Sequence, residues 1–143
     1  MSLTSSLLVS LGGAIGTLAR YVISIAALPI SGSLPLGTIV INITGSFVIG
    51  FFGTLTLAQG RYPVSEDLRL FVMIGLCGGY TTFSSFSLQT LDLMRSGAGF
   101  RAAVNVVVSV LLCFCAVAAG HAIASKLNGG AAQIAQVAIE EES

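Results

Sequence analysis

Charged residues are scarce in this sequence, and their scarcity decides the broad class of the protein. Only 8% of the 143 residues are charged, against about 25% in a typical soluble domain. The six basic and six acidic residues cancel, so the chain lacks the basic surface that binds nucleic acid, and we expect no nucleic-acid partner. The single histidine forms no catalytic set or metal cluster, and no phosphate-binding loop is present. We therefore do not expect an enzyme.

Cysteine is also rare, and the three cysteines do not predict a disulfide framework or a zinc site. Cys77, Cys113 and Cys115 are odd in number, and all fall in apolar stretches. We interpret them as ordinary buried thiols.

Long uncharged stretches are the dominant positive feature. The chain is 55% hydrophobic with a mean hydropathy of +0.96, and residues 1–19, 21–60, 70–91 and 102–125 carry no charge. Since about 20 apolar residues cross a bilayer as a helix, the second stretch holds most of two spans. The sequence predicts an all-α protein with four transmembrane helices, multi-pass in the cell membrane (plasma or inner). The first stretch lacks the basic start and cleavage site of a signal peptide, so we interpret it as a retained helix.

Turn and capping residues set the expected helix boundaries. We expect helices at residues 4–27, 36–58, 66–95 and 100–126, which form one transmembrane domain over 1–126, followed by a flexible acidic tail at 127–143. Ser65 with Glu66 and Asp67 after it is typical of a helix N-terminus. Gly12 and Gly16 have the spacing that lets membrane helices approach closely.

The loop charges bear on orientation. Four spans place both ends of the chain on one side of the membrane. The positive charges divide almost evenly between the sides: Arg61, Arg69 and Lys126 on one, Arg95 and Arg101 on the other, with Arg20 inside the first helix. So small a bias predicts insertion in both orientations and an antiparallel homodimer. The alternative is a single orientation fixed by another feature.

A polar run interrupts the third predicted helix. Residues 75–87 contain paired glycines, Gly78 and Gly79, followed by five serines and threonines and two phenylalanines. Irregular backbone survives at membrane depth only inside protein or beside water. A break near the glycines would free the carbonyls of Gly78 and Thr81 for a hard cation such as Na⁺. The alternative is that the glycines only permit close packing.

Phe83 and Phe86 share one face of the helix after the break. An aromatic ring has a positive edge, so two rings turned edge-on favour a small anion, and the neighbouring hydroxyls supply O–H donors. The alternative is that both rings only fill space.

Two polar stripes at four-residue spacing face this helix. The stripe on helix 36–58 is Thr38, Asn42 and Ser46, and the stripe on helix 100–126 is Asn105, Ser109 and Cys113. We interpret the pair as the wall of a narrow polar track, the alternative being hydrogen bonds that join helices.

Arg20 and the missing carboxylates complete the pattern. No acidic residue lies within the first, second or fourth predicted helix, which argues against a proton-coupled antiporter because such carriers need an intramembrane carboxylate. Arg20 either extends to the lipid headgroups or forms a positive vestibule that concentrates anions.

The chain resembles the Fluc (CrcB) fluoride channels. The resemblance covers roughly residues 10–120 and rests on four features: Gly12-Gly13-x-x-Gly16-x-x-x-Arg20-Tyr21, Pro35-x-Gly37-Thr38-x-x-x-Asn42, Gly75-x-x-Gly78-Gly79-x-Thr81-Thr82-Phe83-Ser84-Ser85-Phe86, and the size with four spans. The third is the most specific. The family is a dual-topology homodimer with two antiparallel fluoride pores and a structural Na⁺ at the dimer centre.

The resemblance implies a role for each matching residue. Na⁺ would be held by the carbonyls of Gly78 and Thr81, and Phe83 and Phe86 would be the pore phenylalanines. The pore lining would include Asn42, Thr38, Ser84, Ser109 and Asn105, with Arg20 at the vestibule. Asn105 and Cys113 depart from the aromatic and hydroxyl residues that the family leads us to expect on the last helix, and Gln89 stands where some members carry Glu.

The predicted function is passive fluoride export from the cytoplasm, down its electrochemical gradient, with the bilayer, fluoride and a second copy of the chain as partners. Two other classes of function stay open. One is a small multidrug-type antiporter, although this sequence lacks the intramembrane acid that such a carrier needs, and the other is a scaffold subunit without ion flux. Proton-coupled cation uptake would indicate the first, and co-purification with a partner the second.

Overall fold

Four long apolar helices build the protein, as the hydropathy predicted. The computed structural model describes residues 2–129; most of the predicted acidic tail at 127–143 lies outside them. The first span is α1 (Leu3–Ala26), followed by a single 3₁₀ turn, η1 (Leu28–Ile30), and the second is α2 (Leu36–Leu55). The fourth is α6 (Gly99–Leu127).

The third span consists of several segments in sequence. It begins with α3 (Glu66–Arg69), widens into the π-helical η2 (Leu70–Cys77), and continues as α4 (Gly78–Tyr80) and α5 (Phe83–Arg95). Ser65 caps its start as predicted, because the Ser65 hydroxyl accepts from the backbone N–H of Leu68 at 3.3 Å. Together these segments are long and apolar enough to cross a membrane.

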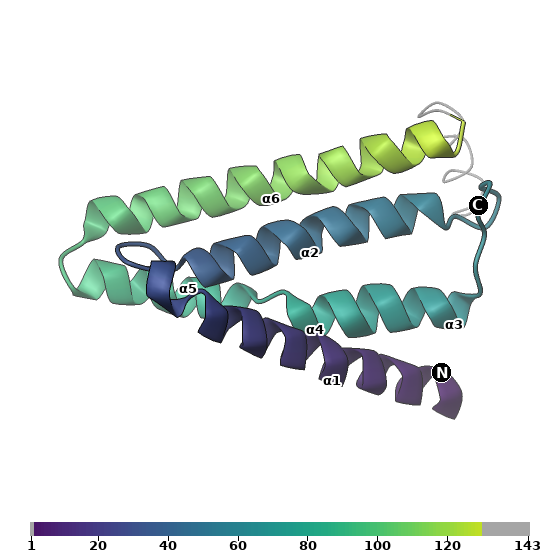
Figure 1. Ribbon diagram of the computed structural model, residues 1–143, viewed down its shortest axis with the longest axis horizontal. Helices are drawn as coiled ribbons and strands as arrows, with labels where there is room; N and C mark the ends of the chain where they lie inside the picture. Colours follow the sequence, from purple (N-terminus) through teal and green to yellow (C-terminus); the bar gives the residue numbers. More distant parts are fainter. Residues whose placement is uncertain (1, 130–143) are drawn as a thin grey trace.

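The spans pack as two layers. α2 lies along α6, and α1 lies along η2 and α4. The start of α1 and the end of α6 lie at the same end of the bundle (Figure 1), as an even number of spans requires.

Glycine determines how closely α1 approaches the third span. A Cβ at Gly12 would lie 2.5 Å from the Phe71 carbonyl oxygen, and a Cβ at Gly75 would lie 2.8 Å from the Val9 carbonyl oxygen. Real carbon–oxygen contacts are not that short, so both positions require glycine for the helices to touch backbone to backbone.

Polar side chains hold the C-terminal end of α2. One guanidinium nitrogen of Arg69, Nη1, donates to the carbonyls of Gly53 (3.1 Å) and Thr56 (2.8 Å) and to the Thr56 hydroxyl (2.8 Å). Asn128 Nδ2 donates to the carbonyls of Thr54 (2.9 Å) and Leu55 (3.0 Å). These bonds satisfy carbonyls that have no partner inside the helix and place positive charge at its negative end.

Much of the apolar surface of the protein is uncovered. Phe83 is 76% exposed and Ile74 is 59% exposed, and a Cβ added at the neighbouring Gly78 would meet no atom within 4 Å. In a membrane protein such a surface faces lipid or another protein.

Candidate functional site

The third span loses its helical conformation at Thr81 and Thr82. Thr81 has φ −77° and ψ 158°, and Thr82 has φ −152° and ψ 106°. Gly78, where the sequence led us to expect the break, is helical with φ −64° and ψ −39°. The interruption therefore follows the paired glycines and does not fall on them. Gly79 serves packing instead, because an added Cβ would collide with the backbone of Gly13 in α1.

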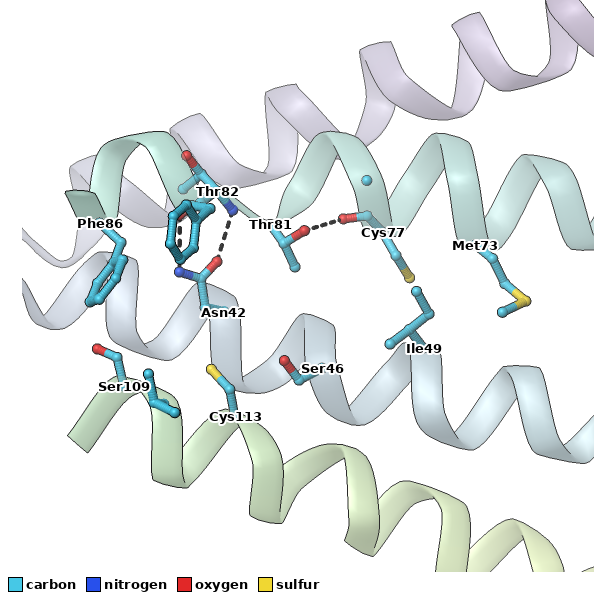
Figure 2. Close-up of a pocket in the computed structure, with 13 residues that line it drawn as sticks. Asn42, Ser46, Ile49, Met73, Cys77, Thr81, Thr82, Phe86, Ser109 and Cys113 are labelled. Carbon is cyan, nitrogen blue, oxygen red and sulfur yellow. Dashed lines mark hydrogen bonds between the residues drawn. The ribbon is translucent and has the colours of Figure 1, made fainter. Parts of the chain in front are cut away.

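The side chain of Asn42, on α2, bridges the interruption. The Thr82 backbone N–H donates to Asn42 Oδ1 at 2.8 Å, and Asn42 Nδ2 donates to the Thr82 carbonyl at 3.1 Å (Figure 2). One amide thus satisfies both backbone groups of a residue that has left the helix. An unpaired peptide group in an apolar environment costs several kcal/mol, so this pairing stabilises the extended conformation.

Three further hydrogen bonds complete the caps on either side of the interruption. The Thr82 hydroxyl accepts from the backbone N–H of Ser85 at 3.2 Å and so caps α5. On the other side, the backbone N–H and hydroxyl of Thr81 both donate to the Cys77 carbonyl, each at 2.9 Å.

These contacts redirect two donors that a continuous helix would use differently. In a continuous helix the N–H of Thr82 would donate to the Gly78 carbonyl, and that of Ser85 to the Thr81 carbonyl. Here the first donates to Asn42 and the second to the Thr82 side chain. The carbonyls of Gly78 and Thr81 therefore lose their usual helical donors, which suits them to bind a hard cation.

Phe83 and Phe86 form a pair at the start of α5. Their ring centroids lie 5.3 Å apart with 51° between the planes. Phe86 is buried at 8% exposure, whereas Phe83 is 76% exposed. The rings are tilted against each other rather than stacked, and the edge of an aromatic ring carries partial positive charge.

A cavity of about 340 Å³ lies beside the interruption and is bounded by α2, η2, α5 and α6 (Figure 2). Its walls combine apolar and aromatic side chains with a few amide, hydroxyl and thiol groups. The lining residues are Asn42, Ser46, Ile49, Met73, Cys77, Gly78, Thr81, Thr82, Phe83, Phe86, Ser109, Val110 and Cys113. None of them is acidic or basic.

The hydroxyl groups that line the cavity differ in whether they already donate a hydrogen bond to another protein group. That of Thr81 donates to the Cys77 carbonyl, and that of Thr82 donates to the Ser85 hydroxyl at 2.9 Å. Ser109 donates to Asn105 over a long 3.5 Å. The Ser46 hydroxyl makes no hydrogen bond within the described residues, so Ser46 and Ser109 are the hydroxyls most available to a molecule in the cavity.

Three predicted lining residues do not reach this cavity. Thr38 is buried one turn before Asn42, Ser84 is exposed, and Asn105 has no exposed surface. None is among the residues that bound the cavity. The Ser84 hydroxyl lies 3.4 Å from that of Thr82.

Arg20 reaches the third span rather than only the solvent. Its Nε donates to the Gly79 carbonyl at 3.2 Å, and the Thr17 hydroxyl donates to the same oxygen at 3.4 Å. In a continuous helix this carbonyl would accept from the N–H of Phe83. The guanidinium therefore binds backbone just before the interruption.

Sequence reasoning omitted several lining residues from the predicted site. Ser46 and Cys113, one turn beyond Asn42 and Ser109, stood on the two predicted polar stripes and do line the cavity, but the family resemblance gave neither of them a role in the pore. The apolar residues Ile49, Met73 and Val110 carry no such signal, because only packing of the helices turns them toward the cavity.

Comparison with known proteins gives a consistent result. Residues 7–121 match the family described as CrcB-like protein, Camphor Resistance (CrcB). A protein of Methylobacterium radiotolerans named fluoride-specific ion channel FluC is 72% identical over 142 residues, covering 99% of each chain. A protein of Gluconobacter oxydans with the same name is 68% identical over 144 residues, covering all of both chains. A third, from Methylocella silvestris, is 54% identical over 121 residues, covering 84% of this chain and 92% of its own.

Proposed function

The chain belongs to the CrcB-like family of ion channels, and on that premise we propose that it is a fluoride-selective channel that carries fluoride out of the cytoplasm. The observation that carries the proposal is the cavity at the interruption, where the paired phenylalanines, the Asn42 amide and the Ser109 hydroxyl converge without a single ionised side chain. Neutral donors and positive ring edges suit a small anion that must also leave again.

Selectivity follows from the chemistry of the walls. Fluoride is small and strongly hydrated, so it enters a narrow path only where close donors replace its water. Ser46, Ser109 and the second N–H of Asn42 Nδ2 supply such donors, and the edges of Phe83 and Phe86 add positive charge density. Chloride is larger and gains less from each donor, so a narrow path disfavours it.

The direction of transport follows from the driving force and needs no coupled ion. Fluoride enters a cell as neutral HF, dissociates at cytoplasmic pH, and is then trapped as an anion. An inside-negative potential favours its exit by about 2.3 kcal/mol per charge per 100 mV. A passive pore in the inner or plasma membrane therefore lowers cytoplasmic fluoride and its toxicity.

The proposal includes an antiparallel homodimer. Phe83, Ile74 and the backbone at Gly78 form an uncovered surface at the interruption, and a second copy would bury it. The even division of basic residues between the two ends permits both insertions. Because Phe83 lines the cavity and is also exposed, the second copy would complete the anion path beside it.

The residues at the interruption also fit a structural Na⁺. The carbonyls of Gly78 and Thr81 have lost their helical donors to Asn42 and Thr82, and carbonyl oxygens suit a hard cation. Such an ion supplies positive charge where these carbonyls would otherwise repel one another across the two copies. Gly78 and Thr81 of both copies would hold it.

Fluoride efflux from liposomes tests the function. Purified protein is reconstituted with internal potassium fluoride or potassium chloride, and release is followed with ion-selective electrodes before and after valinomycin. We expect rapid fluoride release that requires valinomycin, because uncompensated charge otherwise stops the flow, and no chloride release. Release driven by a proton gradient without the ionophore would indicate an antiporter, and no release from folded, dimeric protein would indicate a scaffold.

A further inference from the structure

Asn105 lies at the centre of a buried hydrogen-bond chain that ends at the cavity. It has no exposed surface. Its Nδ2 donates to the Thr90 hydroxyl on α5 at 2.8 Å, and its Oδ1 accepts from the Ser109 hydroxyl at 3.5 Å. The Thr90 hydroxyl in turn donates to the Phe86 carbonyl at 2.7 Å. Of these four residues, Ser109 and Phe86 line the cavity, whereas Asn105 and Thr90 lie behind it.

All the hydrogen bonds in this series donate in the same direction, because the group at one end of the series can only accept. The Phe86 carbonyl has no hydrogen, so the Thr90 hydroxyl must donate to it. The Thr90 oxygen is then the acceptor for Asn105, which must present its NH₂ group there. The opposite end of the amide, Oδ1, therefore faces Ser109, and Ser109 must donate.

This direction decides what Ser109 presents to the cavity. While its hydrogen is directed at Asn105, the Ser109 hydroxyl turns its lone pairs toward the cavity. These lone pairs repel an anion. At 3.5 Å the bond is longer than ordinary O–H···O bonds and is correspondingly weak. A hydroxyl rotates about its C–O bond, so an anion in the cavity can draw the hydrogen away from Asn105.

From this geometry we propose that Asn105 is a positioning residue of the anion path: it holds the Ser109 hydrogen when the cavity has no anion and releases it when an anion arrives. The competition weakens anion binding at Ser109 and so favours rapid passage over tight occupancy. This inference rests on the proposed function and adds a residue that touches neither the anion nor the cavity.

The first test replaces the competing acceptor. In Asn105→Leu, which keeps the branched shape of the side chain without its polar atoms, the Ser109 hydrogen has no partner and is free for the anion. The fluoride concentration at half-maximal flux through liposomes should fall about twofold, the factor that corresponds to a hydrogen bond at the weak end of the usual net range. Maximal flux should not rise, because a more tightly held anion leaves more slowly.

The second test leaves Asn105 in place. Thr90→Val removes the hydroxyl that fixes the amide orientation, so the amide can turn its NH₂ toward Ser109 and free the same hydrogen. We expect a shift in the same direction as in Asn105→Leu, although Thr90 lies off the cavity. Thr90→Ser keeps the hydroxyl and is the matched control, for which we expect the wild-type value.

A Ser109→Ala background separates positioning from general distortion. If Asn105 acts through Ser109, neither Asn105→Leu nor Thr90→Val shifts the half-maximal concentration further in that background. A shift that persists there, an unchanged concentration in the single variants, or a rise in it would overturn the proposal. Wild-type protein that conducts no fluoride would instead overturn the channel function itself, so the two failures are distinguishable.

Discussion

Replacing Asn42 by leucine should destabilise the interruption of the third span specifically. Two bonds are lost, from the Thr82 N–H at 2.8 Å and to the Thr82 carbonyl at 3.1 Å. Each contributes about 0.5–1.5 kcal/mol net, so we expect the local free energy of opening at Thr82 to fall by about 1–3 kcal/mol. Leucine has the same branched shape as asparagine but lacks its donor and acceptor.

Hydrogen exchange at the Thr82 amide measures this local effect directly. A loss of about 1–3 kcal/mol corresponds to exchange that is roughly 5- to 150-fold faster at that amide. Amides near the start of α1, far from the interruption, should exchange as in the wild type. Fluoride flux should fall in parallel, because Phe83 and Phe86 follow directly from the residue that Asn42 holds.

Ser46→Ala is the matched control for Asn42→Leu. Ser46 lies one turn further along the same face of α2 and lines the same cavity, but its side chain makes no hydrogen bond within the described residues. It should leave exchange at Thr82 unchanged, whatever its effect on flux. Wild-type exchange at Thr82 in Asn42→Leu would refute the argument that Asn42 holds the interruption open.

Four further outcomes follow from the structure. Phe83→Ile or Phe86→Ile should reduce fluoride flux in liposomes, since an aliphatic side chain has no positive ring edge; wild-type flux in both would remove the aromatic role. Gly12→Ala should lower the thermal stability in detergent by about 1–3 kcal/mol, because its Cβ would lie 2.5 Å from the Phe71 carbonyl oxygen; an unchanged melting temperature would contradict that close approach. Arg69→Ala removes three bonds at the end of α2 and should lower stability by about 2 kcal/mol, with Arg69→Lys intermediate; equal loss in both would show that the guanidinium geometry is essential. Replacing Na⁺ by a large organic cation during purification should reduce flux and the dimer fraction, and unchanged values would argue against a structural Na⁺.

Hydropathy and helix periodicity predicted the fold class well, because both are properties of neighbouring residues. The predicted four spans are present as four helices long enough to cross a membrane, and Ser65 was correctly interpreted as a cap. The position of the interruption could not be predicted from the residues next to it. It depends on Asn42, forty residues away along the chain, which supplies the partners for Thr82 that a helix would otherwise provide.

The sequence predicted part of the candidate site, because the spacing of residues along a helix is also a property of neighbouring residues. Asn42, Phe83, Phe86 and Ser109 came together at one cavity, since four-residue spacing places polar side chains on one helix face. Asn105 belongs to the same stripe as Ser109, yet it lies behind the cavity. Spacing defines a face of α6 but not how far the helix is rotated toward its neighbours.

The amino-acid order alone determined that this chain is an apolar four-helix protein with a polar interruption in its third span, because burial of apolar surface and backbone hydrogen bonding are set residue by residue. Tertiary structure decided which donors face the cavity. The hydrogen of Ser109 points toward Asn105 only because Thr90, on another helix, must donate to the Phe86 carbonyl. Hydrogen-bond direction passes from one packed helix to the next, and no stretch of sequence carries it by itself.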